Sequence, residues 1–120
     1  MTPWLLVGAG SAAGGAARYA VYLVLAKLGA GTFPWGTVAV NLAGSFLIGW
    51  FAHLSPPAEM ESRLLVMTGF CGGFTTFSTF SLDLLNMLRA GEAGKAFAYL
   101  ALQLGLCLGA VWLGWLAARR

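Results

Sequence analysis

Charged residues are scarce in this chain of 120 residues, of which they make up 9%, whereas ordinary soluble domains have about 25%. Hydrophobic residues make up 59%. A soluble domain of this size buries only about 60–70% of the surface that its unfolded chain exposes, so much of the apolar surface must face lipid instead. The Lys and Arg residues form no basic stripe, which argues against a nucleic-acid partner.

The sequence also has few of the residues from which catalytic and metal sites are usually built. Its two cysteines, Cys71 and Cys107, lack the paired Cys and His spacing of a metal site, and we interpret them as buried free thiols. No nucleophile and base stand in a recognisable pattern. The sequence therefore predicts that the protein is not an enzyme.

The stretches between charged residues predict how often the chain crosses the membrane. A helix needs about 20 largely apolar residues to span the hydrocarbon core. Four such stretches are present, near residues 3–27, 35–53, 63–88 and 94–117, and short turns join them. We expect a single domain over residues 1–120, an all-α membrane protein of four transmembrane helices.

Small residues recur at four-residue spacing, which lets neighbouring helices approach closely. The pairs are Gly10 with Gly14, Ser11 with Gly15, Gly69 with Gly73, and Gly105 with Gly109. Tight packing within one bundle explains most of them. Because four helices alone rarely enclose a pathway, we expect some of these faces to form a dimer.

The distribution of Lys and Arg gives no preferred orientation in the membrane. In a four-span chain, both termini lie on the side of the middle loop. That side carries Arg63, Arg119 and Arg120, and the other side carries Lys27, Arg89 and Lys95. Orientation follows the excess of these residues on one side. A chain without an excess can insert both ways, and opposite copies would form an antiparallel homodimer; a single prevailing orientation is the alternative.

Polar side chains within the predicted spans are candidates for function, because they are costly in lipid. Arg18 cannot deprotonate, and a water-filled vestibule that attracts anions would suit it. Asn41 offers two N–H donors to an anion, although a hydrogen bond between helices is the ordinary alternative. Asp83 is interpreted as an interfacial charge, with a basic partner as the alternative.

The third span contains a pattern that is unfavourable for a continuous helix. Tandem glycines at residues 72–73 precede β-branched residues at 75–76, which predicts a break at mid-membrane. The first half-helix would end in unpaired carbonyls, which suit a hard cation such as Na⁺. The second half-helix would begin with free N–H groups, which favour an anion.

Aromatic and hydroxyl side chains follow this break. Phe77 and Phe80 are three residues apart and share a helix face, and their ring edges carry partial positive charge. The interleaved hydroxyls belong to Ser78, Thr79 and Ser81. Together with Asn41 they predict a lining rich in donors for a small anion, whereas core packing of the phenylalanines is the alternative.

These residues carry a resemblance that covers essentially the whole chain. The segments GGAARY at 14–19, NLAGSFLIG at 41–49 and GFCGGFTTFSTFS at 69–81 resemble those of the Fluc (CrcB) family of bacterial fluoride channels. The resemblance implies an antiparallel homodimer in the bacterial inner membrane, with two pores that passively export cytoplasmic fluoride and thereby relieve its toxicity.

The resemblance also implies roles for individual residues. Backbone carbonyls of Gly72 and Thr75 match those that hold a structural Na⁺ at the dimer axis. Asn41, Phe77 and Phe80 match pore residues, with Ser78 and Thr79 beside them, and Arg18 matches a vestibule arginine.

The fourth span departs from the family pattern of a tyrosine followed by hydroxyls at four-residue spacing. Tyr99 matches the aromatic position, but Gln103 and Cys107 follow it. Gln103 can still donate, whereas a thiol is a weak donor. A small proton-coupled multidrug exporter is the main alternative function, but it needs a buried Glu in the first span. A subunit that serves only assembly would explain the glycines but not the donors.

Overall fold

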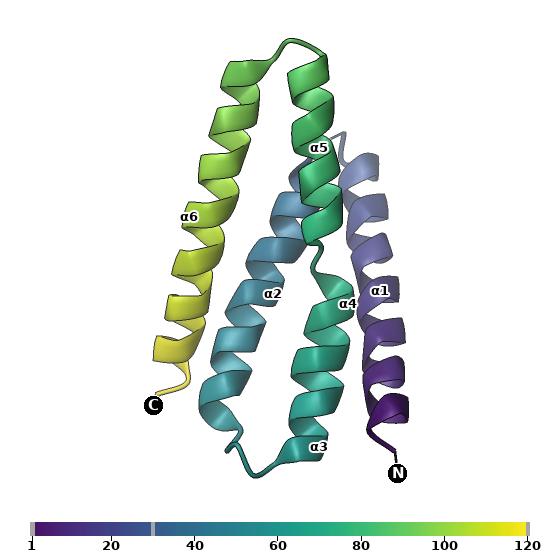
Figure 1. Cartoon of the computed structure of the whole chain (residues 1–120), viewed down its shortest axis with the longest axis vertical. Coiled ribbons are helices and arrows are strands. Elements are labelled where there is room, and N and C mark those ends of the chain that lie inside the picture. The colour runs from purple at the N-terminus through teal and green to yellow at the C-terminus, as the bar shows by residue number, and fades with distance from the viewer. Residues whose placement is uncertain (1, 30, 120) are drawn as a thin grey trace.

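In the computed structural model, which describes residues 2–29 and 31–119, every element is a helix (Figure 1). The prediction of an all-α protein is confirmed. The elements are α1 (Pro3–Lys27), α2 (Trp35–Leu54), α3 (Met60–Arg63), the π-helical η1 (Leu64–Cys71), α4 (Gly72–Phe74), α5 (Phe77–Arg89) and α6 (Ala93–Ala117).

Three helical segments are long and apolar enough to cross a membrane: α2, the stretch Met60–Arg89 that runs from α3 to α5, and α6. The long axis of the molecule, 48 Å, resembles the roughly 40–45 Å of a bilayer with its headgroups. These features indicate a membrane protein. α1 also has 25 residues but is less apolar, because it combines many small residues with Arg18, so its crossing stays a prediction.

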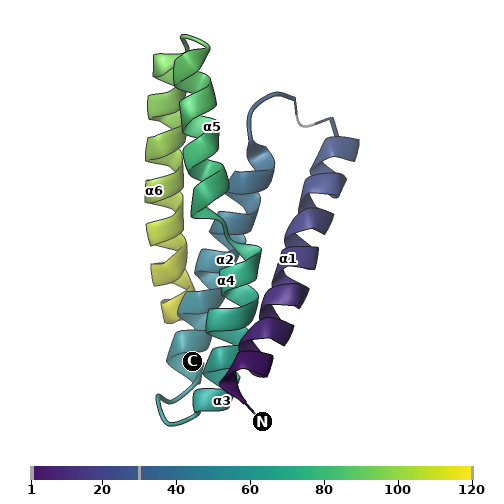
Figure 2. The same cartoon turned by 45° about the vertical axis from the view of Figure 1, so that its right-hand side comes forward.

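The helices pack in two close pairs. α1 lies against η1 and α4, and Figure 2 shows it parting from α5 towards its Lys27 end. α2 lies against α6. Glycine allows both contacts to be close. A Cβ on Gly14 would collide with the carbonyl oxygen of Phe70, and a Cβ on Gly114 would collide with the carbonyl oxygen of Phe46. The two halves of the broken segment therefore have different neighbours: α1 beside the first half and α6 beside the second.

Only some of the small-residue pairs serve this packing. Gly10, Gly69 and Gly73 lie in the contact between α1 and the broken segment, where the Ser11 hydroxyl also donates to the Gly69 carbonyl at 3.4 Å. By contrast, a Cβ on Gly105 or Gly109 would meet nothing within 4 Å. The prediction that some small-residue faces join two copies of the chain stays open.

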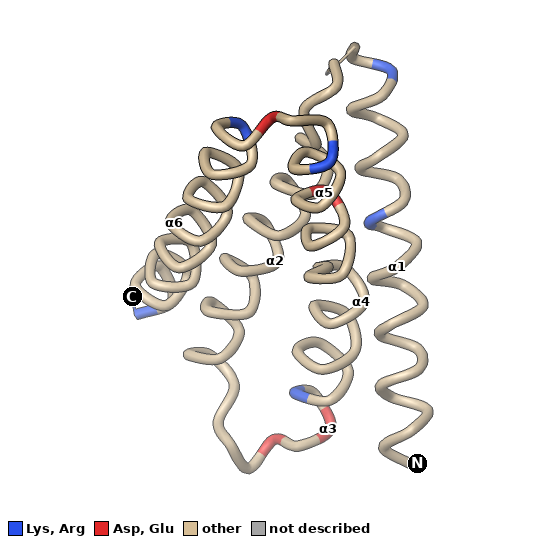
Figure 3. Tube along the Cα trace, turned by 45° about the horizontal axis from the view of Figure 1, so that its top comes forward, with Lys and Arg blue, Asp and Glu red and all other residues tan. Residues whose placement is uncertain are grey.

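Charged residues gather at the ends of the helices (Figure 3). The exceptions are Arg18 in the middle of α1 and Asp83 within α5. Lys95 and Glu92 form an ion pair of 3.8 Å at the turn before α6. Arg120, one of the six residues in the orientation count, lies outside the described residues.

Candidate functional site

The membrane segment Met60–Arg89 is interrupted at its middle. Thr75 and Thr76 have extended backbone conformations, with φ and ψ of −87° and 163° and of −153° and 116°. The Thr76 hydroxyl oxygen accepts from the Thr79 N–H at 3.1 Å and so caps α5. The break thus lies where the glycine and threonine pattern predicts it.

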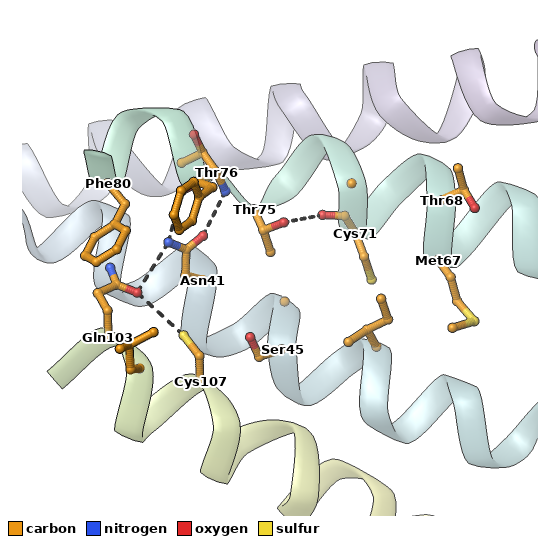
Figure 4. Close-up of a pocket in the computed structure, with 15 residues that line it drawn as sticks. Asn41, Ser45, Met67, Thr68, Cys71, Thr75, Thr76, Phe80, Gln103 and Cys107 are labelled. Atoms are coloured by element: carbon orange, nitrogen blue, oxygen red, sulfur yellow. Dashed lines mark hydrogen bonds between the residues drawn. The ribbon is translucent and has the colours of Figure 1, made fainter. Parts of the chain in front are cut away.

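Asn41 on α2 holds the backbone of this break (Figure 4). Its Oδ1 accepts from the Thr76 N–H at 2.8 Å, and its Nδ2 donates to the Thr76 carbonyl at 3.1 Å. Buried backbone groups without a partner cost several kcal/mol in lipid, so these two bonds stabilise the extended conformation. Asn41 therefore makes the bond between helices that was the alternative to anion contact.

The second hydrogen of Asn41 Nδ2 goes to α6. It is donated to Oε1 of Gln103 at 3.3 Å, and the Cys107 thiol lies 3.5 Å from the same oxygen. Gln103 is only 4% exposed. Its Nε2 is buried and makes no well-directed hydrogen bond among the described residues, although the Tyr99 oxygen is close enough to interact with it. A buried amide with idle donors needs an explanation.

The two phenylalanines of α5 form an edge-to-face pair, with ring centroids 5.7 Å apart and planes at 63°. Phe80 is 4% exposed and packs edge-to-face against the fully buried Tyr99. Phe77, by contrast, is 75% exposed. Core packing, the alternative reading of the pair, therefore describes Phe80 but does not account for Phe77.

These groups meet in one open groove of about 450 Å³ between α2, the broken segment and α6. Of the predicted site residues, it is lined by Asn41, Gly72, Thr75, Phe77, Phe80 and Gln103. Four others do not line it. Arg18 lies half-buried on α1, and Ser78 is exposed. The Thr79 hydroxyl is hydrogen-bonded to that of Thr76, and the ring of Tyr99 packs against the ring of Phe80.

Asp83 has partners that the sequence analysis missed. Its Oδ2 accepts from the Tyr99 hydroxyl at 2.8 Å and from the Thr37 hydroxyl at 3.2 Å. No ion pair to Asp83 is found in the part of the chain that the structure describes. These three residues come from α2, α5 and α6, and no spacing within one segment signals such a cluster.

The groups expected to bind Na⁺ are backbone carbonyls at the break. Within residues 2–29 and 31–119, no hydrogen bond reaches the carbonyl oxygens of Gly72 or Thr75. Gly72 is exposed, and a Cβ on it would meet nothing within 4 Å. Free carbonyl oxygens are suitable ligands for a hard cation. The residues present therefore fit the ion, although one chain supplies only two such oxygens.

Long apolar helices around a groove with polar groups at a helix break define a helical membrane protein. The sequence profile described as "CrcB-like protein, Camphor Resistance (CrcB)" matches residues 5–115. The chain belongs to this family.

Three similar relatives each have the name fluoride-specific ion channel FluC. The relative from Methylocella silvestris is 49% identical over 96% of this chain and 90% of its own length. The relative from Opitutus terrae is 48% identical over 98% of this chain and 93% of its own length. The relative from Paramagnetospirillum magneticum is 46% identical over 98% of this chain and 96% of its own length. An ion channel catalyses no reaction, so this family is not one of enzymes.

Proposed function

We propose that this protein is a passive fluoride channel that exports cytoplasmic fluoride across a bacterial inner membrane and so relieves fluoride toxicity. The observation that carries the proposal is the meeting of two phenylalanine rings and two side-chain amides in one groove at a helix break. The names of the relatives support fluoride as the permeant ion.

The chemistry of the groove suits a small anion. Fluoride binds water strongly, so a pore has to replace the water hydrogens with donors at short range. Ring edges and amide N–H groups are such donors, and the apolar remainder of the groove does not trap the ion. The groove therefore offers a path with weak donors in succession rather than one strong anion site.

An antiparallel homodimer would complete this path, with one pore on each side of the two-fold axis. A large exposed aromatic ring such as Phe77, and an open groove beside it, favour a surface that a second copy covers. The balanced charge count at the two ends permits both orientations. In this arrangement α1 also crosses the membrane, so that each subunit has four spans.

A structural Na⁺ at the dimer axis follows from the same arrangement. The carbonyl oxygens of Gly72 and Thr75 from one subunit are two ligands, and a two-fold axis makes them four. Arg18 would stand in a vestibule that attracts the anion. Ser78, Thr79 and Tyr99 would lie beside the pore once the second subunit is in place.

Anion efflux from liposomes tests the function. Liposomes with the purified protein are loaded with fluoride or chloride, and an ion-selective electrode records release without a proton gradient. We expect rapid release of fluoride and little release of chloride. Absence of fluoride release, or proton-driven uptake of an organic cation, would support the exporter instead.

A further inference from the structure

We propose that the side-chain NH₂ of Gln103 is the amide donor to the conducted anion, and that Asn41 is a positioning residue that aims it. This inference rests on the proposed function. It differs from the sequence prediction, in which the NH₂ of Asn41 itself contacts the ion. The difference arises because both hydrogens of Asn41 Nδ2 are already used.

The orientation of the two amides follows from one backbone group. An N–H can only donate, so the atom of Asn41 that faces the Thr76 N–H at 2.8 Å must be its oxygen. Nδ2 of Asn41 is then directed to the Thr76 carbonyl and to Gln103. The Gln103 atom that receives this hydrogen must be its oxygen. Nε2 of Gln103 therefore points away from Asn41.

The nitrogen of Gln103 is directed to the Phe80 side of the groove (Figure 4). It is buried and makes no well-directed hydrogen bond among the described residues, the Tyr99 oxygen being the acceptor close to it. A dehydrated anion beside the Phe80 ring would supply an acceptor, and the ring edge would add a second favourable contact. A water molecule needs both donors and acceptors around it. The position beside Gln103 Nε2 and Phe80 offers donors only, which favours an anion over water.

A competing arrangement uses the Tyr99 oxygen. Tyr99 lies one helical turn before Gln103 on α6, and its hydroxyl hydrogen is given to Asp83 at 2.8 Å. A small shift would let Gln103 Nε2 donate to the Tyr99 oxygen instead. In that case the amide would be a packing element, and its hydrogens would not respond to fluoride.

The sequence provides a selective probe, because Gln103 is its single glutamine. The full-length protein is labelled with ¹⁵N in the glutamine side chain, so that one NH₂ pair is observed by NMR in detergent micelles. Sodium fluoride is titrated against sodium chloride at equal concentration. We expect one of the two proton signals to move downfield and to saturate with fluoride only.

Asparagine labelling provides the comparison, since the chain has only Asn41 and Asn86. The Asn41 NH₂ signals should move little with fluoride, because their hydrogens stay on Thr76 and Gln103. A large fluoride-specific shift at Asn41, or none at Gln103 in protein that conducts fluoride, overturns the proposal. Protein that conducts no fluoride contradicts the proposed function itself.

Flux measurements test the consequence. Gln103→Met keeps the length of the side chain but has no donor, and Gln103→Glu keeps the acceptor for Asn41 while replacing the NH₂ with oxygen. Both should lower fluoride flux about tenfold or more, since a hydrogen bond to a charged partner is lost. Asn86→Ala, which removes an exposed side-chain amide on α5 outside the groove, is the control and should conduct normally. Normal flux in Gln103→Met would contradict the proposal.

The positioning role of Asn41 has its own readout. In Asn41→Ala the Gln103 oxygen loses the donor that orients it, so the amide can turn over. The single glutamine signal should then broaden or split, and its fluoride-dependent shift should weaken. An unchanged glutamine signal in Asn41→Ala would show that Asn41 does not aim the amide.

Discussion

Asn41 and Thr76 are joined by two hydrogen bonds of opposite direction, of 2.8 Å to the Asn41 oxygen and 3.1 Å from its nitrogen. The side-chain amide thus pairs with both backbone groups of one extended residue, as a neighbouring strand would in a sheet. No water is available in the hydrocarbon core to take this role. Asn41 on α2 therefore supplies hydrogen-bond partners for the backbone groups of Thr76. This explains how an interrupted helix is tolerated there.

Asn41→Ala should destabilise the protein, because it leaves the N–H and the carbonyl of Thr76 without partners. Each buried group left unpaired costs about 1–3 kcal/mol. Thermal unfolding in detergent, followed by circular dichroism, measures the loss. Asn86→Ala is the matched control: Asn86 is exposed on α5, and its replacement should change stability by no more than about 0.5 kcal/mol. Equal melting temperatures for the two variants would contradict the role of Asn41.

Phe77→Ile should strongly lower fluoride flux while the protein still assembles, because the ring edge is lost but apolar bulk remains. Phe97 is a matched control, since it is 72% exposed on α6 against 75% for Phe77, and it does not line the groove. Flux from liposomes and size-exclusion chromatography are compared for Phe77→Ile and Phe97→Ile. Normal flux in both variants would reduce Phe77 to a packing residue.

Phe80→Ile should lower flux and stability together. Phe80 is 4% exposed and contacts Tyr99, so its replacement leaves a cavity that costs about 1 kcal/mol or more. The melting temperature should fall for Phe80→Ile and stay nearly unchanged for Phe77→Ile. Equal melting temperatures for the two variants would show that the packing of the buried Phe80 ring does not contribute to stability.

The sequence predicts the helices and the break because both depend on neighbouring residues. Apolar length between charges defines the helix ends to within a few residues, and the glycine and threonine pattern places the break at Thr75 and Thr76. The first helix also has its predicted bounds, but its membrane crossing stays a prediction because its small residues contribute little apolar surface.

The polar contacts of the site could not be predicted in the same way. The amide chain joins Asn41, Thr76 and Gln103 from three segments, and Asp83 likewise receives its donors from two other helices. Nothing in the local pattern indicates which donors remain free after such contacts form. The sequence therefore identified residues that line the groove. It could not predict which donor bonds to which acceptor.

Both insertion orientations should coexist in the membrane, because Lys and Arg are balanced between the two sides. A cysteine is added at the C-terminus of a variant with Cys71→Ala and Cys107→Ala, and sealed vesicles are treated with an impermeant maleimide. About half of the cysteines should react before the vesicles are opened, and the remainder afterwards. Reaction from one side only would exclude the antiparallel dimer.

Activity should depend on Na⁺ during assembly and not on the Thr75 side chain. The Thr75 hydroxyl donates to the Cys71 carbonyl at 2.9 Å, whereas its own carbonyl oxygen is the group expected to bind the ion. Thr75→Ser keeps that hydroxyl and should conduct nearly normally. Thr75→Val keeps the branched shape and should lose only about 1 kcal/mol of stability from one hydrogen bond. A strong loss of flux in Thr75→Ser would indicate that the side chain contacts the ion.

The ion itself is tested by preparation without Na⁺. Two carbonyl oxygens from one chain are too few for a cation that has lost its water, so binding should require both subunits. Protein purified and reconstituted in Li⁺ or K⁺ should conduct fluoride poorly, and its dimers should separate more readily on dilution in detergent. Na⁺ should restore both properties slowly, because an ion enclosed at the dimer axis would exchange slowly. Normal fluoride flux in protein kept free of Na⁺ throughout would rule out this role of the broken helix.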